Sequence, residues 1–241
     1  NDYERFNLRS KIEYQATDRL KVGGNMIFSN ATKNLEAGSA WHTAYYAVPI
    51  MPVYDEMNTE AWPDKFTSAQ LLGYRDGKNP FPAMTYDRNK QKIRKINANF
   101  FAELELIPKK LTFKSSYSHA FTSLNQRNVG LPYYITSGAQ RENATINKTA
   151  SVWSNQIWDN ILTYNLEVGA HKVVAMGGTS YRDDAYEGLW AGGINFPYEQ
   201  QEAWYISQAE TKPEQNVGDN GLRQYGISYF GRLSYNSTTA I

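Results

Sequence analysis

The feature that most constrains this chain is a repeated alternation of apolar and polar residues with a period of two. In residues 6–14 the even positions carry large apolar side chains: Phe6, Leu8, Ile12 and Tyr14. The intervening positions are polar or charged: Asn7, Arg9, Lys11 and Glu13. Successive side chains of a strand point to opposite faces, so this pattern predicts a β-strand with one apolar and one charged face.

Similar runs recur along the chain and predict an all-β, antiparallel fold. We expect about seven long strands: residues 6–14, 20–30, 96–106, 111–124, 150–164, 171–190 and 223–236. The later runs extend the apolar face: Leu20, Val22, Met26, Phe28, Phe100, Leu104, Phe113, Tyr117, Tyr225, Ile227, Tyr229, Leu233 and Tyr235. They extend the charged face too: Glu103, Glu105 and Arg232. The alternation leaves open which face residues 150–164 and 171–190 turn toward the apolar side. In the first of these runs two sets compete: Trp153, Ile157 and Ile161 against Val152, Trp158, Leu162 and Tyr164.

The connections between these runs alternate between short and long. Short turns are expected near residues 16–19, 107–110 and 165–170, and longer irregular stretches near 31–91, 125–149 and 191–222. Consecutive antiparallel strands would place all the short turns at one end of the sheet and all the long loops at the other, as in outer-membrane barrels. All nine prolines are expected in turns or loops. Short helices are expected near residues 40–46 and 67–72.

Strand length and aromatic placement favour a membrane barrel over a soluble sandwich. Six of the seven predicted strands have about 9 to 15 residues and the run at 171–190 is longer, whereas strands of globular sheets usually have 5–6. Aromatic residues make up 14% of the chain, and several lie on the apolar face near strand ends: Tyr14, Phe28, Phe121, Tyr164 and Tyr235. Amphipathic rings at that position are typical of an interfacial girdle. We therefore expect the apolar face to contact lipid and the charged face to line a wet lumen.

Composition and motifs exclude several other classes. The chain has no Cys, which excludes disulfides, thiolate zinc sites and iron–sulfur clusters. A formal net charge of +1 gives no electrostatic support for nucleic-acid binding. His42, His119 and His171 are far apart, and no nucleotide-binding, nucleophile-elbow or metalloprotease motif is present. We predict neither enzymatic activity nor a cofactor or metal site. The Gly-Gly pairs at 23–24, 177–178 and 192–193 are predicted to be bulges, bends or close-packing points.

The long loops are rich in aromatic residues that could stack on sugars or pack on peptides. They are Trp41, Trp62, Tyr74, Tyr133, Tyr134, Trp190, Trp204 and Tyr205. The alternative, which is favoured for any one residue, is that these rings pack the loops into an ordered cap. Loops on a rigid scaffold often carry function, so both roles are kept.

Four segments, in order, resemble the SusC/RagA family of TonB-dependent outer-membrane transporters. They are DYERFNLR at residues 2–9, LKVG at 20–23, PIMPVYD at 49–55 and YFGRLSYN at 229–236. The family commonly places Gly soon after the Tyr-Asp of the third segment, whereas EMN follows here at residues 56–58. Because of this departure, the family's loop conformation and ligand contacts are not carried over to residues 56–58.

The resemblance implies a roughly 22-stranded barrel with an N-terminal plug. Such proteins import oligosaccharides or peptides across the bacterial outer membrane, with a SusD-like surface lipoprotein as lid and the TonB complex as energy source. The chain starts at Asn1 and shows no signal peptide, plug or barrel C-terminus. We therefore interpret residues 1–241 as part of one barrel domain, an excerpt that would supply wall and extracellular loops.

Two other functions remain as alternatives. A passive outer-membrane porin would share the wall but would lack a plug and a TonB-contact segment upstream. A soluble, secreted carbohydrate-binding β-protein would use the loop tryptophans, and it would fold alone in plain buffer.

Overall fold

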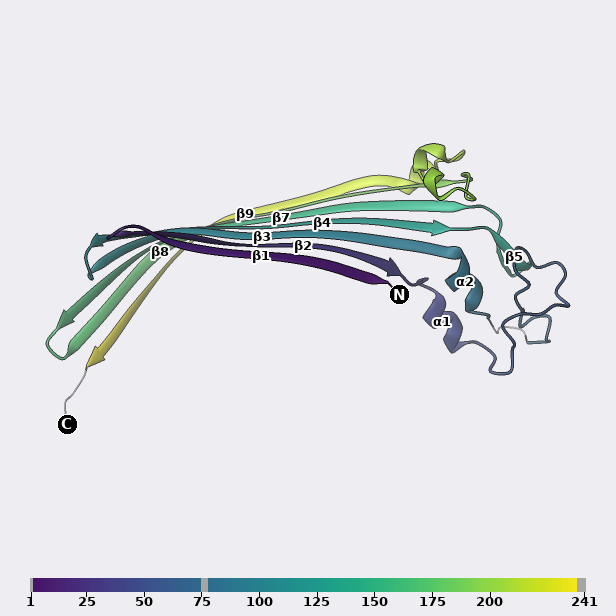
Figure 1. Ribbon diagram of the computed structural model, residues 1–241, viewed down its shortest axis with the longest axis horizontal. Coiled ribbons are helices and arrows are strands. Elements are labelled where there is room, and N and C mark those ends of the chain that lie inside the picture. Colours follow the sequence, from purple (N-terminus) through teal and green to yellow (C-terminus); the bar gives the residue numbers. More distant parts are fainter. Residues whose placement is uncertain (1, 75–77, 238–241) are drawn as a thin grey trace.

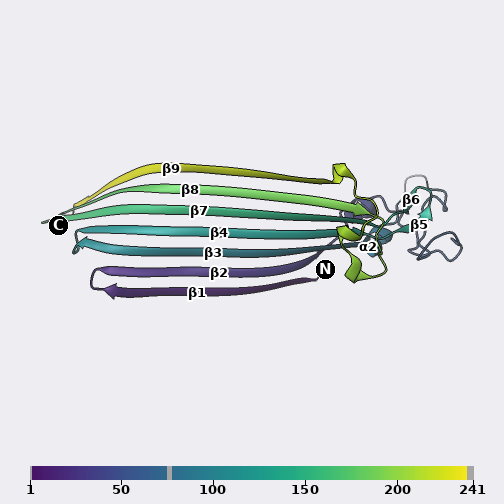
Figure 2. The same ribbon diagram turned by 90° about the horizontal axis from the view of Figure 1, so that it is seen from above.

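The computed structural model describes residues 2–74 and 78–237, and its dominant element is one curved sheet of long antiparallel strands (Figure 1). Seen from above, the strands lie side by side in chain order (Figure 2). They are β1 (Tyr3–Thr17), β2 (Leu20–Leu35), β3 (Asp87–Ile107), β4 (Leu111–Gly130), β7 (Thr145–Val168), β8 (His171–Ile194) and β9 (Val217–Ser237). The predicted all-β, antiparallel architecture of a β-barrel segment is confirmed.

The strands extend further toward the long loops than the alternation predicted. β7 and β8 have 24 residues each, and β3 begins at Asp87 rather than near residue 96. The β3 extension, residues 87–95, is polar except for Ile93, and the β8 extension, residues 191–194, is Ala-Gly-Gly-Ile, so neither shows an alternation of apolar and polar residues. They are held instead by pairing with neighbours, such as Asn34 with Lys90 and Thr145 with Ile194. A membrane-crossing strand needs about 9–11 residues, so a strand of 24 residues is more than twice as long as a crossing requires. At about 3.3 Å per residue it measures about 80 Å.

The predicted division of turns and loops between the two ends of the sheet is confirmed. Residues 18–19, 108–110 and 169–170 form the short turns, and Lys109 and Gly169 have positive φ values of 63° and 58°. The long connections lie at the opposite end, and their described residues are 36–74, 78–86, 131–144 and 195–216. No proline interrupts a strand within the described residues, although Pro82 lies in the first turn of a helix, where the missing N–H is harmless.

Strand register decides which side chains share a face, because directly opposed residues point the same way. Leu8 opposes Phe28, Phe28 opposes Ile96, and Ile96 opposes Phe121. The register also settles the two strands whose face the alternation left open. Tyr117 opposes Trp158, which opposes Tyr181. The apolar set of β7 that joins this face is therefore Val152, Trp158, Leu162 and Tyr164.

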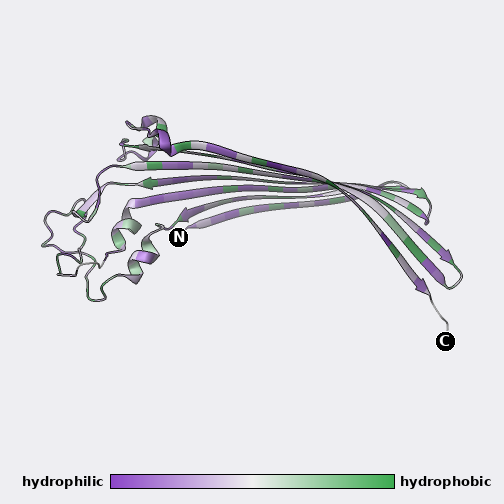
Figure 3. Ribbon diagram, turned by 180° about the vertical axis from the view of Figure 1, so that it is seen from behind, coloured by the Kyte–Doolittle hydropathy of each residue, from purple (hydrophilic) through white to green (hydrophobic). Residues whose placement is uncertain are grey.

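The apolar band crosses the sheet obliquely. The row that starts at Phe6 in β1 reaches Gly221 in β9, yet the first aromatic residue of that face in β9 is Tyr225. The band therefore moves along the strands from β1 to β9. Strands that tilt relative to a barrel axis produce this stagger, and the ribbon coloured by hydropathy shows how apolar and polar positions alternate along each strand (Figure 3).

The long loops fold into a cap with two small hydrophobic cores. Its elements are α1 (Ala40–Tyr45), α2 (Phe81–Tyr86), β5 (Tyr133–Thr136), β6 (Ala139–Arg141), and the 3₁₀ turns η1 (Gln201–Ala203), η2 (Ile206–Gln208) and η3 (Glu214–Asn216). The helix expected near residues 40–46 is present as α1. The helix expected near residues 67–72 was wrong: successive turns end at Gly73, which has φ +82°, and the second helix starts after Pro80. Neither helix, nor any other in the described residues, is long and apolar enough to span a membrane.

Candidate functional site: two faces and a loop cap

One face of the sheet, the aromatic face, gathers the large apolar side chains. The register places on it every residue predicted from β1 to β9: Phe6, Leu8, Ile12, Tyr14, Leu20, Val22, Met26, Phe28, Phe100, Leu104, Phe113, Tyr117, Tyr225, Ile227, Tyr229, Leu233 and Tyr235. Many of them are open to the surroundings, and Tyr229 is 79% exposed. Such an extended apolar surface is far larger than soluble monomers usually expose.

The opposite face, the charged face, carries acidic and basic side chains that alternate and form ion pairs. Asn7, Arg9, Lys11, Glu13, Glu103, Glu105 and Arg232 all lie on it. Glu13 accepts from Lys11 Nζ at 3.0 Å and from Lys21 Nζ at 2.8 Å. Lys21 opposes Glu103, which opposes Lys114, with the last pair at 3.7 Å. Opposite charges on directly opposed positions stabilise a sheet, and these groups need water around them.

Glycines on both faces make room for an aromatic ring on the neighbouring strand. Gly23 opposes Phe101, Gly24 opposes Phe100, and Gly178 opposes Phe230. A Cβ at any of these glycines would meet the opposing ring within 2.7 Å. The glycine pairs at 23–24 and 177–178 are not bulges, because the register shifts only between Gln15 and Thr17 and between Glu105 and Ile107 within the main sheet. Close packing, one of the predicted roles, applies to Gly23, Gly24 and Gly178, whereas a Cβ at Gly177 would have no contact nearer than 4.0 Å.

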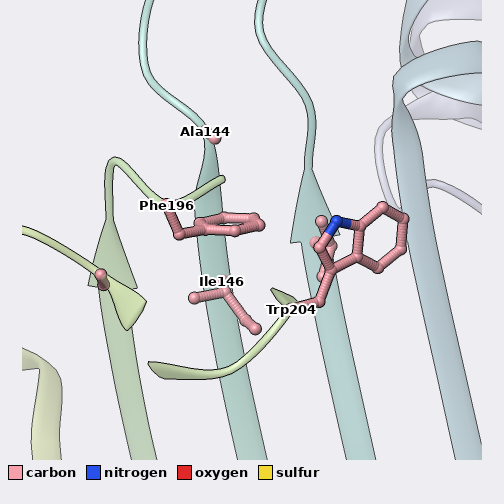
Figure 4. Close-up of a cluster of buried hydrophobic side chains, with 6 residues drawn as sticks. Ala144, Ile146, Phe196 and Trp204 are labelled. Atoms are coloured by element: carbon pink, nitrogen blue, oxygen red, sulfur yellow. The ribbon is translucent and has the colours of Figure 1, made fainter. Parts of the chain in front are cut away.

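Two of the predicted loop aromatics are packed inside the cap. Trp204 is 7% exposed, donates its Nε1–H to the Tyr198 carbonyl at 3.0 Å, and packs with Phe196 and Ile146 in the first core (Figure 4). Tyr133 stacks on Tyr86 with ring centroids 5.1 Å apart and borders the second core. The surroundings of both residues match the packing role.

The second core contains a tyrosine whose titration is shifted. The Tyr86 hydroxyl donates to Asp64 Oδ2 at 2.6 Å and accepts the Asp64 backbone N–H at 3.2 Å. Its ring also meets Phe66 edge-on, with centroids 5.9 Å apart. Burial, reinforced by the hydrogen bond to the carboxylate, raises the pKa of Tyr86 well above its ordinary value. Asp64 thereby connects the segment before Phe66 to α2.

The other loop aromatics are more accessible. Trp41 in α1 is 78% exposed and donates its Nε1–H to Glu36, and Tyr205 is 56% exposed. Trp62 and Tyr134 exchange backbone hydrogen bonds of 2.8 and 2.7 Å, which joins two separate loops. Tyr74 is partly exposed beside the turn at Gly73. The structure does not bring these rings into one cluster; they lie around the loop end.

The prediction that Trp190 lies on a loop was wrong. β8 continues to Ile194, and Trp190 sits on the charged face with its ring over Gly218 of β9. Sequence reasoning also missed an aromatic pair on the same face: Trp153 opposes Tyr186, with centroids 5.3 Å apart. A signal existed, because Trp153 belongs to the β7 set that competed for the aromatic face, but only pairing with β8 reveals its partner.

No arrangement typical of a metal or hydrolytic centre is present in the part of the chain that the structure describes. No group of three or more metal-ligating side chains occurs among these residues. The three histidines are separate: His42 contacts Tyr46 in the cap, His119 contacts Ser154, and His171 stacks on Tyr235. Each makes a local contact with a neighbouring side chain.

Comparisons with known proteins point in one direction. No protein-family model matches the chain. The TonB-dependent receptor P3 of Formosa agariphila is 28% identical to it over 98% of this chain. The solved RagAB peptide transporter superposes on 98% of the chain with a TM-score of 0.72 at 17% identity, and RagAB in its closed-closed state with a TM-score of 0.69. The chain spans about a quarter of these relatives: 23% of the receptor and 26% of the RagAB chain.

The sequence match, the strand meander and the one-sided loops agree with the four segments that suggested the family. The predicted resemblance is confirmed at this level: over almost its whole length the chain is similar in sequence to a stretch of a TonB-dependent receptor, and it shares the fold of a stretch of the RagAB transporter.

Proposed function

We propose that this chain forms part of the barrel wall and the extracellular loops of a TonB-dependent outer-membrane transporter that imports oligosaccharides or peptides. The observation that carries the proposal is the continuity of the two faces over all seven strands, combined with long loops at only one end. A similar TonB-dependent receptor, aligned over almost the whole chain, supports the same conclusion.

In this proposal the aromatic face contacts lipid and the charged face lines the aqueous interior. Tyr225, Tyr229 and Leu233 are more than 70% exposed in the single-layered sheet. Transfer of one large apolar side chain from water to an apolar environment is favourable by about 1.5–3 kcal/mol. Contact with lipid would provide this free energy for each such side chain on the aromatic face. Arg9, Lys11 and Glu13 would remain hydrated on the lumen side.

A soluble sandwich fits these observations less well. Such a fold covers its apolar face with a second sheet about 10 Å away. The described residues place no second large sheet against the aromatic face; the other sheet is the two-stranded pair of β5 and β6 in the cap. A passive porin would share the wall, and the similarity to a TonB-dependent receptor favours the transporter.

The exposed cap residues are the proposed contacts for cargo or for a lid. A SusD-like surface lipoprotein would meet the loop end, where Trp41, Trp62, Tyr134 and Tyr205 offer aromatic surface. The TonB complex would act through other parts of the full protein. Loop aromatics suit sugar rings and peptide side chains alike, so cargo of either class is included in the proposal.

The test uses the full-length protein in its native host. We expect it in the detergent-extractable outer-membrane fraction, and recovery as a soluble protein without detergent would overturn the proposal. Uptake of labelled oligosaccharides and peptides should depend on TonB. Trp41→Ala and Tyr205→Ala should reduce uptake while the barrel remains folded, whereas Tyr229→Phe, a conservative change on the aromatic face, should leave uptake unchanged. Uptake that persists without TonB would indicate a passive pore.

A further inference from the structure

Three cations lie directly side by side where the aromatic face continues into the loop end. Lys90 of β3 opposes Arg127 of β4, which opposes Lys148 of β7. We call these three residues the basic row. Lys92 and Arg94 of β3 lie on the same face, between the basic row and Ile96 of the aromatic face. The face thus changes from apolar to basic along a single strand.

This arrangement is unfavourable for the isolated protein. Like charges on directly opposed positions destabilise a sheet. On the charged face, Lys21, Glu103 and Lys114 alternate in sign across three strands. The basic row has no such alternation, and within residues 2–74 and 78–237 none of its cations forms an ion pair. An anion supplied from outside would relieve the repulsion.

The β8–β9 loop holds two of the cations with aromatic rings. The Arg127 guanidinium lies 5.3 Å from the Trp204 ring centroid, and Lys148 Nζ lies 4.5 Å from that of Tyr205. A ring face attracts a cation but accepts few of its hydrogen bonds. Arg127 Nε is buried and has no hydrogen-bond partner among the described residues. The rings therefore fix the cations in place and leave donors available.

A groove runs between the basic row and this loop. One cavity of about 520 Å³ is lined by Lys90, Lys92, Arg127 and Lys148, together with the Asn125 amide and Tyr205. A second cavity of about 750 Å³ shares Lys90 and Arg127 and reaches Trp41 and Trp204, but Asp2, Glu36 and Asp87 also line it, so the anion site is assigned to the first cavity. Volumes of this size are typical of small-ligand sites and would accommodate a phosphorylated sugar.

The distance of the groove from the aromatic face indicates where its ligand comes from. Arg94 is two residues from Ile96, about 7 Å along the strand, and Lys90 is six residues away, about 20 Å. Headgroups occupy only about 5–8 Å beyond the hydrocarbon core on each side of a bilayer. The cations therefore begin at headgroup level and continue above it, where only a lipid with a large protruding headgroup would reach.

We propose that this groove binds the phosphate groups of a phosphorylated glycolipid in the outer leaflet. The inference rests on the proposed membrane orientation. Lys90, Lys92 and Lys148 would donate charge-assisted hydrogen bonds to phosphate oxygens, with Arg127 behind them and Asn125 donating from its amide. The glycolipid would remove the like-charge repulsion and connect the wall to the loop that carries Trp204 and Tyr205.

The test compares the full-length protein with its triple variant K90Q/R127Q/K148Q in detergent. Bound diphosphoryl lipid A is titrated by native mass spectrometry. We expect at least tenfold weaker binding for the variant, because each contact of a phosphate with a charged donor is worth about one order of magnitude. The melting temperature of each protein is also measured with and without lipid A, and we expect lipid A to raise that of the wild type and to leave that of the variant unchanged.

Control variants and lipids make each outcome decisive. K90R/K148R should keep binding, and K95Q on the charged face should bind like the wild type. Equal binding of dephosphorylated lipid A, or equal stabilisation by inorganic phosphate alone, would overturn the glycolipid assignment. Unchanged binding by the triple variant would overturn the site. A wild-type protein that is not in the outer membrane would instead contradict the proposed function, which fractionation shows independently.

Discussion

Phe230 of β9 lies directly across from Gly178 of β8, with its ring where a side chain at position 178 would be. A Cβ at Gly178 would lie 2.7 Å from Phe230 Cζ and 2.8 Å from the backbone oxygen of Asn160. The ring could move, but the backbone oxygen belongs to the paired strand and could not. A Cβ at the adjacent Gly177 would have its nearest contact with the Phe230 carbonyl oxygen, at 4.0 Å.

This pair of neighbouring glycines offers a matched test of packing. We expect Gly178→Ala to destabilise the barrel by about 1–3 kcal/mol, because the added methyl group overpacks the sheet. Gly177→Ala should be nearly neutral. Urea unfolding of the full-length protein in detergent, followed by heat-modifiable gel mobility, measures both. Equal losses in the two variants would show that glycine flexibility, rather than the space for Phe230, matters here.

Neighbouring residues of β9 test the assignment of the faces. Tyr229 lies on the aromatic face and Ser228 on the charged face. The chain has no Cys, so single cysteines are readily introduced into a full-length protein without other accessible thiols. We expect Ser228→Cys to react with a water-soluble maleimide in intact outer membranes and Tyr229→Cys to be protected by lipid. The reverse pattern would refute the orientation of the sheet.

Trp204 and Tyr205 separate packing from surface contact within the β8–β9 loop. Trp204 is buried in the first core, whereas Tyr205 is 56% exposed. Trp204→Ala should leave a cavity and destabilise the loop by about 3–5 kcal/mol, seen as faster hydrogen exchange in residues 195–216. Tyr205→Ala should leave exchange nearly unchanged. If Tyr205→Ala loosened the loop as much, the Lys148–Tyr205 contact would be a main structural support.

The Tyr86–Asp64 hydrogen bond predicts how the cap responds to alkaline pH. The pKa of Tyr86 is raised above its ordinary value of 10.0 in the folded cap. The contribution of Tyr86 to stability is therefore complete below about pH 10 and is lost as the pH rises toward the folded-state pKa, since the opened loop ionises first. Limited proteolysis of residues 36–86 should accelerate above about pH 10.

The matched variant for this prediction is Tyr86→Phe. It removes the hydroxyl, leaves the ring stacked on Tyr133, and should cost about 1 kcal/mol at neutral pH through the lost hydrogen bond. Its alkaline loosening should be weaker than that of the wild type. An identical pH profile in both proteins would assign the effect to another group, of which Tyr133, whose pKa burial also raises, is the first candidate.

The central parts of the strands could be predicted because their residues alternate in polarity. A shift by one residue would move Phe6, Leu8, Ile12 and Tyr14 to the charged face and Arg9 and Lys11 to the aromatic face, which in the proposed orientation would place charges in lipid and rings in water. The strand ends could not be predicted in this way. Asn34 and Lys90 belong to strand extensions without a regular alternation of polarity. They join their strands only because the neighbouring strand supplies hydrogen-bond partners.

The sequence by itself thus determined the membrane-type meander, its two faces and the end that carries the loops, since these depend on period and on connection length. Only the tertiary structure decided which cations become neighbours. Lys90, Arg127 and Lys148 are far apart in the chain, and each belongs to a different strand. Their meeting in one row depends on the register across three strands, and register is a property of paired strands that no single strand contains.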